Sequence, residues 1–264
     1  MTVRFNITVF ALAIFMGLSV RTVMLLSIID PVSGFVKSQY MLYAVLMIAF
    51  LIFAAGFIFL VSYFMPLKGK ESFVPGSIPF CVSLFIMAGA IFFESFIAKI
   101  GSAANLMQQL LYYAFSVLAI VALIYIGVFK LAKKEYHPLA ALAPAIFFIV
   151  RMVVIFADFS TMSTISDTII ETVSGCLIII VTLYYAKLES GFAAKHHTRL
   201  FFAITLMATY ACAIGSVPRI ICESAAQAKS IVLHQIIIPS YSGIAFALFC
   251  AALAYDILFS LKKA

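Results

Sequence analysis

The sequence predicts an all-α, polytopic membrane protein whose eight transmembrane helices form two parallel four-helix repeats. Composition is the first reason, because 66% of the residues are apolar, 10% are charged and the mean hydropathy is +1.20. Soluble domains do not have such a composition. The apolar residues also form long uninterrupted runs, and the two halves of the chain match each other at an offset of 130 residues.

Eight apolar runs are long enough to cross a membrane, since about 20 helical residues span a hydrocarbon core of about 30 Å. They lie near residues 4–29, 39–65, 78–100, 105–132, 139–159, 163–187, 199–221 and 236–260. The first run resembles a secretory signal because Arg4 precedes it. The run resumes directly after Arg21, however, so we predict an uncleaved first helix.

An internal duplication is predicted from two matched windows. The segment 11–23 shares six of thirteen residues with 141–153, including Arg21 and Arg151, and the segment 122–133 shares six of twelve with 252–263. The halves are therefore expected to be 1–134 and 135–264, joined by a polar turn. Four crossings return a chain to its starting side, so the two repeats should run parallel.

Basic residues predict the orientation of the chain. If eight helices alternate, eleven Lys and Arg residues fall on the side of the termini and four on the other side. Both termini are therefore expected in the cytoplasm, with the protein in the cytoplasmic (plasma) membrane and the lipid bilayer as its surroundings. Nucleic acid is not an expected partner, because no soluble basic face exists to bind it.

Charged residues inside the helices mark a candidate substrate or proton site. They lie roughly 9 to 12 Å below the outer ends of their helices or close to that level, so they should cluster in one layer. The candidate site residues are Arg21, Glu94, Arg151, Asp167, Glu171 and Arg219. The candidate polar lining is Asn105, Gln109, Tyr112, Thr164, Ser174 and Ser216.

Two interpretations of these charges remain open. In the structural interpretation Arg21 pairs with Glu94 and Arg151 pairs with Glu223, one ion pair per repeat, because an unpaired intramembrane charge is costly. In the functional interpretation the charges line an outward-open cavity. Asp167, Glu171 and Arg219 have no counterparts in the first half and favour this second interpretation.

Acidic groups outnumber basic groups in the predicted layer when Asp30, Asp158 and Glu223 are counted. Either a carboxyl group is protonated there or a cationic group binds. Asp167 and Glu171, one turn apart on a helix, are the expected place for a shared proton. Asp256 near the inner surface is expected to pair with Lys262 and Lys263.

No cofactor or metal is predicted. The four histidines lie in loops or at a helix edge, whereas haem requires axial ligands inside the bundle. The pair His196–His197 is interpreted as a solvated basic loop, and the five scattered cysteines form no disulfide framework. No nucleotide-binding or nucleophile motif occurs, so enzymatic activity is the less favoured class.

The leading functional hypothesis is a small-solute permease or solute-binding membrane protein, with an outward-facing site for a small polar or cationic solute between the repeats. Asp167 and Glu171 would bind a cationic group or a proton, and Arg219 an anionic group. The alternative is a non-transporting subunit or sensor that binds a membrane-protein partner and uses the charges as structural ion pairs. An intramembrane lipid-modifying enzyme is the third hypothesis.

Overall fold

The computed structural model describes residues 3–29, 36–65, 75–97, 106–158, 165–191, 197–229 and 241–262. Within this part the chain forms eight α-helices, as the sequence predicts. They are α1 (Val3–Val23), α2 (Met41–Tyr63), α3 (Ile78–Phe92), α4 (Leu106–Leu131), α5 (Leu142–Asp158), α6 (Ile165–Glu189), α7 (His197–Lys229) and α8 (Tyr241–Lys262).

Seven helices of the described part are long and apolar enough to cross a membrane. The remaining helix, α5, carries a shorter apolar stretch, Pro138–Val154, which begins in a 3₁₀ turn at Pro138–Ala141. The multi-pass helical architecture therefore agrees with the sequence prediction.

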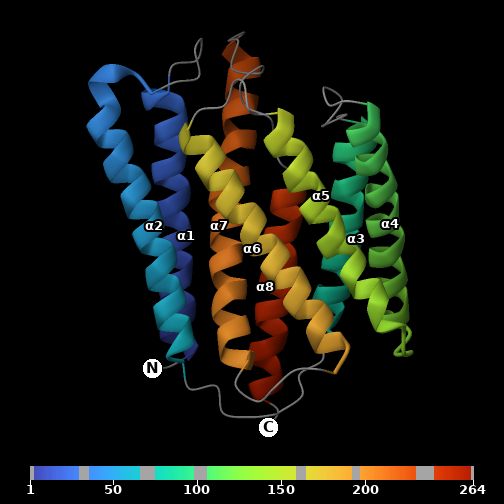
Figure 1. Ribbon diagram of the computed structural model, residues 1–264. Coiled ribbons are helices and arrows are strands. Elements are labelled where there is room, and N and C mark those ends of the chain that lie inside the picture. Colours follow the sequence, from blue (N-terminus) through green and yellow to red (C-terminus); the bar gives the residue numbers. More distant parts are fainter. Residues whose placement is uncertain are drawn as a thin grey trace.

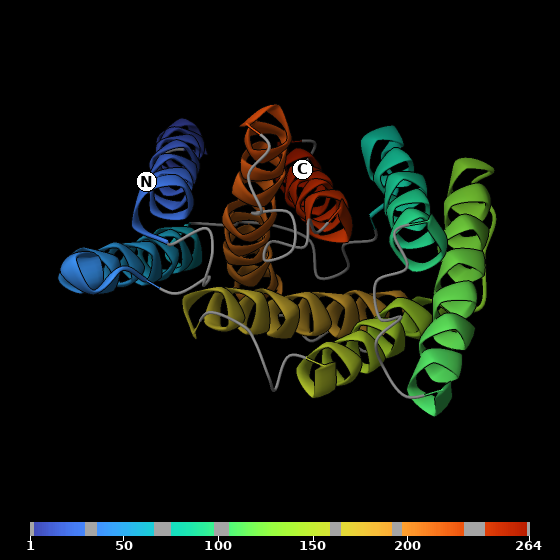
Figure 2. The ribbon, with the colours of Figure 1, turned by 90° about the horizontal axis from the view of Figure 1, so that it is seen from above.

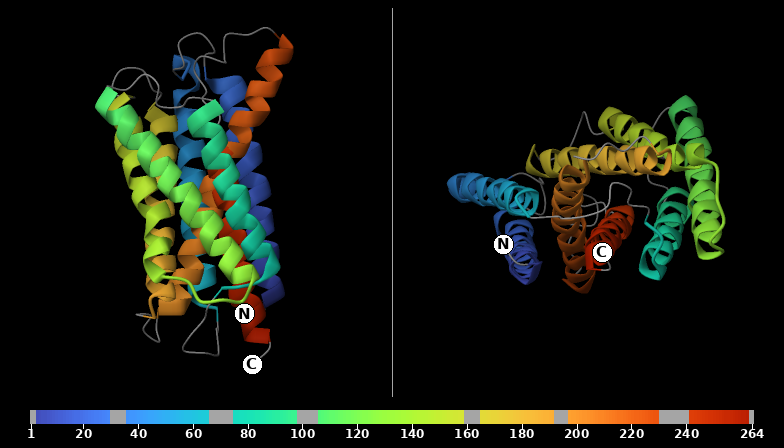
Figure 3. Two further views of the ribbon diagram at one scale, coloured as in Figure 1. Left: turned by 90° about the vertical axis from the view of Figure 1, so that its right-hand side faces the viewer. Right: turned by 90° about the horizontal axis from the view of Figure 1, so that it is seen from below.

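The helices run alternately up and down, and both termini lie at the same end of the bundle (Figures 1 and 3). We call this the terminal end. Two helices continue into π-helical turns at the opposite end, α1 through Met24–Ile28 and α3 through Phe93–Ile97. Helix α8 begins inside the bundle, below the upper ends of its neighbours (Figure 1).

The two halves of the chain pack differently. In the second half α5, α6, α7 and α8 form a continuous series of contacts, whereas α2 and α3 share no extensive interface within the described residues. The first half instead divides into two hairpins on either side of α7 and α8 (Figure 2). The α1–α2 hairpin packs on α7, while α3 packs on α8 and α4 packs on α5.

One large hydrophobic core joins residues from both halves. Close helix approach is visible where Gly17 of α1 faces α7, because a Cβ atom at this position would lie 2.7 Å from the Tyr210 hydroxyl oxygen. Small residues allow such approach between membrane helices. The α1–α2 hairpin is therefore fitted closely to the second half of the chain.

Candidate functional site

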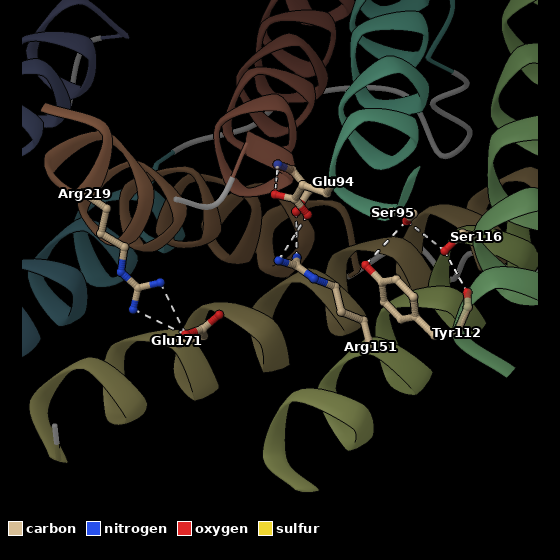
Figure 4. Close-up of polar contacts among 8 residues, drawn as sticks. Glu94, Ser95, Tyr112, Ser116, Arg151, Glu171 and Arg219 are labelled. Atoms are coloured by element: carbon tan, nitrogen blue, oxygen red, sulfur yellow. Dashed lines mark hydrogen bonds and ion pairs between the residues drawn. The ribbon is translucent and has the colours of Figure 1, made fainter. Parts of the chain in front are cut away.

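Four charged residues lie toward the end of the bundle opposite the termini, each in the half of its segment that is farther from the terminal end, and Figure 4 shows their contacts. We call them the charge layer: Glu94 from the π-helical turn after α3, Arg151 from α5, Glu171 from α6 and Arg219 from α7. Two belong to one ion pair and two to another. The sequence predicts that the intramembrane charges cluster, and the structure brings these four together in two ion pairs.

Glu94, Arg151 and Ser242 form a buried triad. The Arg151 guanidinium lies 3.3 Å from the Glu94 carboxylate and donates to the Ser242 hydroxyl at 2.6 Å. The backbone N–H of Ser242 donates to the other Glu94 oxygen at 2.6 Å. Since Ser242 lies in the first turn of α8, Glu94 also lies at the positive end of that helix dipole. Three helices are thereby joined through groups that are almost fully buried.

This triad corrects the pairing expected from the sequence. Glu94 forms its ion pair with Arg151 of the other half, not with Arg21 of its own half. The physical reason is the divided first half, because α3 packs against α8 while α1 packs on the far side of α7. Arg151 consequently has its partner across the two halves, and the side chain of Glu223 lies outside the described residues.

The second ion pair joins Arg219 to Glu171. Both terminal nitrogens of Arg219 lie 3.3 Å from one Glu171 oxygen. The Glu171 side chain is 28% exposed, against 1% for Glu94. The negative charge of Glu171 also favours the charged form of Arg151. This is the more open of the two pairs.

Arg21 is completely buried, next to the π-helical turn that follows α1. One of its terminal nitrogens lies 3.3 Å from the Met24 sulfur, and its charge repels that of Arg219. Three arginines and two glutamates are thus described at this end of the bundle. The side chains of Asp30, Asp158, Asp167 and Glu223 lie outside the described residues, so the predicted excess of acid stays a prediction.

The polar lining is described in part. Tyr112 and Ser116 of α4 form a buried hydrogen-bonded group with Ser95, which the sequence analysis did not include (Figure 4). Gln109 is half-buried on α4 and Ser216 is buried on α7. Ser174 donates to carbonyl oxygens of its own helix. Asn105 and Thr164 lie outside the described residues.

A second polar group, near the terminal end, was missed by the sequence analysis. Lys130 of α4 lies 2.6 Å from Glu189 of α6, and both side chains are at most 7% exposed. The ammonium group of Lys130 also faces the rings of Phe80, Tyr136 and Tyr185 at 5.7, 5.4 and 6.0 Å. We call these five residues the lysine cage. In the sequence analysis Lys130 is only one of the eleven basic residues that predict the orientation of the chain.

The cage is closed by the turn between α4 and α5, which carries Tyr136. The Tyr136 hydroxyl lies 3.1 Å from that of Tyr185. Burial raises the pKa of the Tyr136 phenol above its usual value, and the nearby Glu189 carboxylate raises it further. Tyr136 therefore remains a neutral hydrogen-bonding group at physiological pH.

A row of neighbouring aromatic rings runs from the lysine cage to Tyr112, which is hydrogen-bonded to Ser95, the residue after Glu94. The centroids of successive rings in this row are 5.2 to 5.8 Å apart, and the shortest separation is that of Phe147 and Phe148, which are adjacent in the sequence. Its members in order are Tyr185, Phe80, Phe249, Phe246, Phe148, Phe147 and Tyr112. Packed aromatic side chains therefore lie between the lysine cage and the hydrogen-bonded group of Ser95, Tyr112 and Ser116.

Asp256 of α8 bonds to the segment that leads into α3. Its carboxylate accepts hydrogen bonds of 3.0 Å from the backbone N–H groups of Gly76 and Ser77, directly before α3. Asp256 therefore joins the start of α3 to α8, while the Ser77 side chain caps α3 by accepting from the Phe80 N–H. The side chain of Lys262 and the whole of Lys263 lie outside the described residues, so the expected pairing of Asp256 with them stays a prediction.

The described residues offer little for metal or nucleophilic chemistry. They contain no group of three or more His, Cys, Asp or Glu residues placed to hold a metal ion. All five cysteines are free, and four of them are buried. The geometry instead supports ion pairing and the binding of charged groups.

No family model, curated protein or solved structure matches this chain.

Proposed function

We propose that this protein is a small-solute permease or solute-binding membrane protein whose site lies in the charge layer. Glu171, with Asp167 on the same helix, would bind the cationic group of the solute or a coupled proton. Arg219 would bind an anionic group, and Arg151 would keep the carboxylates in place. The terminal end would face the cytoplasm, as the distribution of basic residues predicts.

The partial exposure of the Glu171 side chain, in its ion pair with Arg219, is the observation on which this proposal depends. A carboxylate within a membrane span is costly and usually serves a substrate or a proton. Glu171 is 28% exposed, so its oxygens can exchange Arg219 for a solute. The Glu94–Arg151 pair is by contrast almost fully enclosed and suits a supporting role.

The start of α8 gives further support. Transporters often place a helix N-terminus within the membrane, next to their binding site. Here the first turn of α8 lies inside the bundle and is held by Glu94 (Figure 1). Glu94 itself lies in a π-helical turn, a local irregularity that is frequent at functional sites.

The alternative is a non-transporting subunit or sensor. The buried triad of Glu94, Arg151 and Ser242 favours it, because every member has a partner within the bundle. Large side chains exposed on α2, such as Phe53 at 72% and Leu42 at 70%, would then face lipid or a partner helix. Stoichiometric co-purification of another membrane protein would favour this function over transport.

The test is uptake and binding in proteoliposomes across a panel of inorganic cations, amino acids and polyamines. Glu171→Gln and Asp167→Asn should abolish or strongly reduce the signal for one class of solute. Glu135→Gln is the matched control, because Glu135 is an exposed carboxylate in a turn. Equal uptake and binding by Glu171→Gln and the parent protein for every solute would refute the proposal.

A further inference from the structure

The lysine cage has the composition of a binding site for an ammonium group. Proteins bind such cations between aromatic ring faces, often with a carboxylate nearby. The cage supplies three rings within 6.0 Å of the Lys130 nitrogen and the Glu189 carboxylate at 2.6 Å. Lys130 also donates to the backbone carbonyl of Pro75. The chain thus fills a complete cation site with its own side chain.

Lys130 is attached at the edge of the cage, in the last turn of α4. The chain then turns sharply, with Lys133 in the left-handed region at φ 53°. A long lysine stem can move its head group toward the membrane surface without moving its helix. We therefore expect Lys130 to leave the cage by rotation of its side chain together with a shift of the turn that carries Tyr136, without movement of α4.

Charge balance requires that another cation replaces Lys130 when it leaves. Glu189 is only 7% exposed, and a buried carboxylate without a partner is strongly unfavourable. Lys130 donates to the carbonyl of Pro75, and Asp256 accepts from the N–H groups of the next two residues, Gly76 and Ser77. The Oδ1 atom of Asp256 is buried without a hydrogen bond among the described residues. A solute cation in the cage would keep both carboxylates compensated.

We propose that the lysine cage is a second solute site, specific for ammonium-type cations, and that Lys130 is a tethered occupant which the solute displaces. This inference rests on the proposed function and narrows its substrate class to solutes with an ammonium group. The aromatic row runs from the cage to Tyr112, whose hydrogen-bond partner Ser95 directly follows Glu94 of the charge layer.

The experiment measures the chemical reactivity of Lys130 in the purified full chain, with tetramethylammonium as the probe. An amine-reactive ester labels lysines, and peptide mass spectrometry gives the rate for each. Lys133 and Lys134 are exposed neighbours and serve as internal references. Lys130 should label much more slowly than both, and tetramethylammonium should raise its rate toward theirs. Sodium chloride at the same ionic strength should not.

Two substitutions assign the effect to the cage. Tyr136→Leu removes one ring that holds Lys130 and should raise the Lys130 labelling rate without probe about two- to five-fold, since one cation–π contact contributes about 0.5–1 kcal/mol. Tyr136→Phe keeps the ring and loses only the hydroxyl, so its labelling rate should lie closer to that of the parent than to that of Tyr136→Leu. Glu171→Gln should also leave the response unchanged, which separates this inference from the charge layer.

An unchanged Lys130 rate in the presence of the probe would overturn the inference, as would loss of the response in Glu171→Gln. Uptake that is lost in Glu171→Gln while the Lys130 response persists would support both proposals. If the Lys130 response is normal and uptake is insensitive to Glu171→Gln, the proposed function is refuted and the cation site in the lysine cage is not.

Discussion

Replacement of Arg151 by methionine tests the buried triad directly. The substitution removes the 3.3 Å ion pair to Glu94 and the 2.6 Å hydrogen bond to the Ser242 hydroxyl. Glu94 would then be a carboxylate that is 1% exposed and retains one described donor, the Ser242 N–H. Loss of one partner from a buried ion pair costs about 3–5 kcal/mol, so the free energy of unfolding should fall by this amount.

The double variant Arg151→Met/Glu94→Met should be more stable than Arg151→Met alone. Both charges are then absent, and the main remaining defect is an unsatisfied N–H group at the start of α8. Such a group costs about 1–3 kcal/mol. The double variant should therefore recover about 2 kcal/mol relative to the single variant, the difference between the two ranges.

The assay is a double-mutant cycle on reversible unfolding in lipid bicelles, with a second cycle on Arg21 and Glu94 as control. The Arg151–Glu94 cycle should give a coupling energy of a few kcal/mol, because each single variant leaves a buried charge. The Arg21–Glu94 cycle should be additive within about 0.5 kcal/mol. Additivity in the first cycle together with coupling in the second would refute the pairing across the halves.

Three further predictions concern packing, capping and pH. Gly17→Ala should lower the free energy of unfolding by about 1–3 kcal/mol through overpacking, since the added Cβ atom would lie 2.7 Å from the Tyr210 hydroxyl oxygen. Gly56→Ala is the control in the same thermal unfolding assay, because nothing lies within 4 Å of its added Cβ atom. Asp256→Ala should cost about 1–3 kcal/mol in chemical unfolding, because two N–H groups at the start of α3 lose their acceptor. Burial raises the pKa of Tyr136, so the folded state holds this proton more tightly than the unfolded state. The resulting stability is present below about pH 10 and is lost as the pH rises further, and Tyr136→Phe should flatten that decline in a pH series of unfolding free energies.

The helices and the level of their charges could be predicted from the sequence, because both depend on local properties. A long apolar run must form a helix when it crosses lipid, and the depth of Glu171 or Arg219 follows from its position in the run. The partner of Glu94 could not be predicted in this way. It depends on which helices become neighbours, and α3 packs beside α8 instead of α1.

The contacts of Lys130 in the lysine cage, at the terminal end, could not be predicted from the sequence either. A lysine at the end of an apolar helix usually extends toward the membrane surface, and Lys130 was interpreted accordingly. Its partner Glu189 lies 59 residues further along the chain, with no local pattern to connect them. The internal duplication also stays a prediction, because matching residues such as Arg21 and Arg151 occupy different packing environments in the two halves.

The division of the first half into separated hairpins has a consequence for biosynthesis. A ribosome inserts α1 to α4 before α7 and α8 have left the exit tunnel. The α1–α2 hairpin cannot reach α7, and α3 cannot reach α8, until these last spans enter the bilayer, whereas α4 can pack on α5 earlier. During that interval Arg21 and Glu94, which are fully buried in the finished bundle, lack the helices that enclose them.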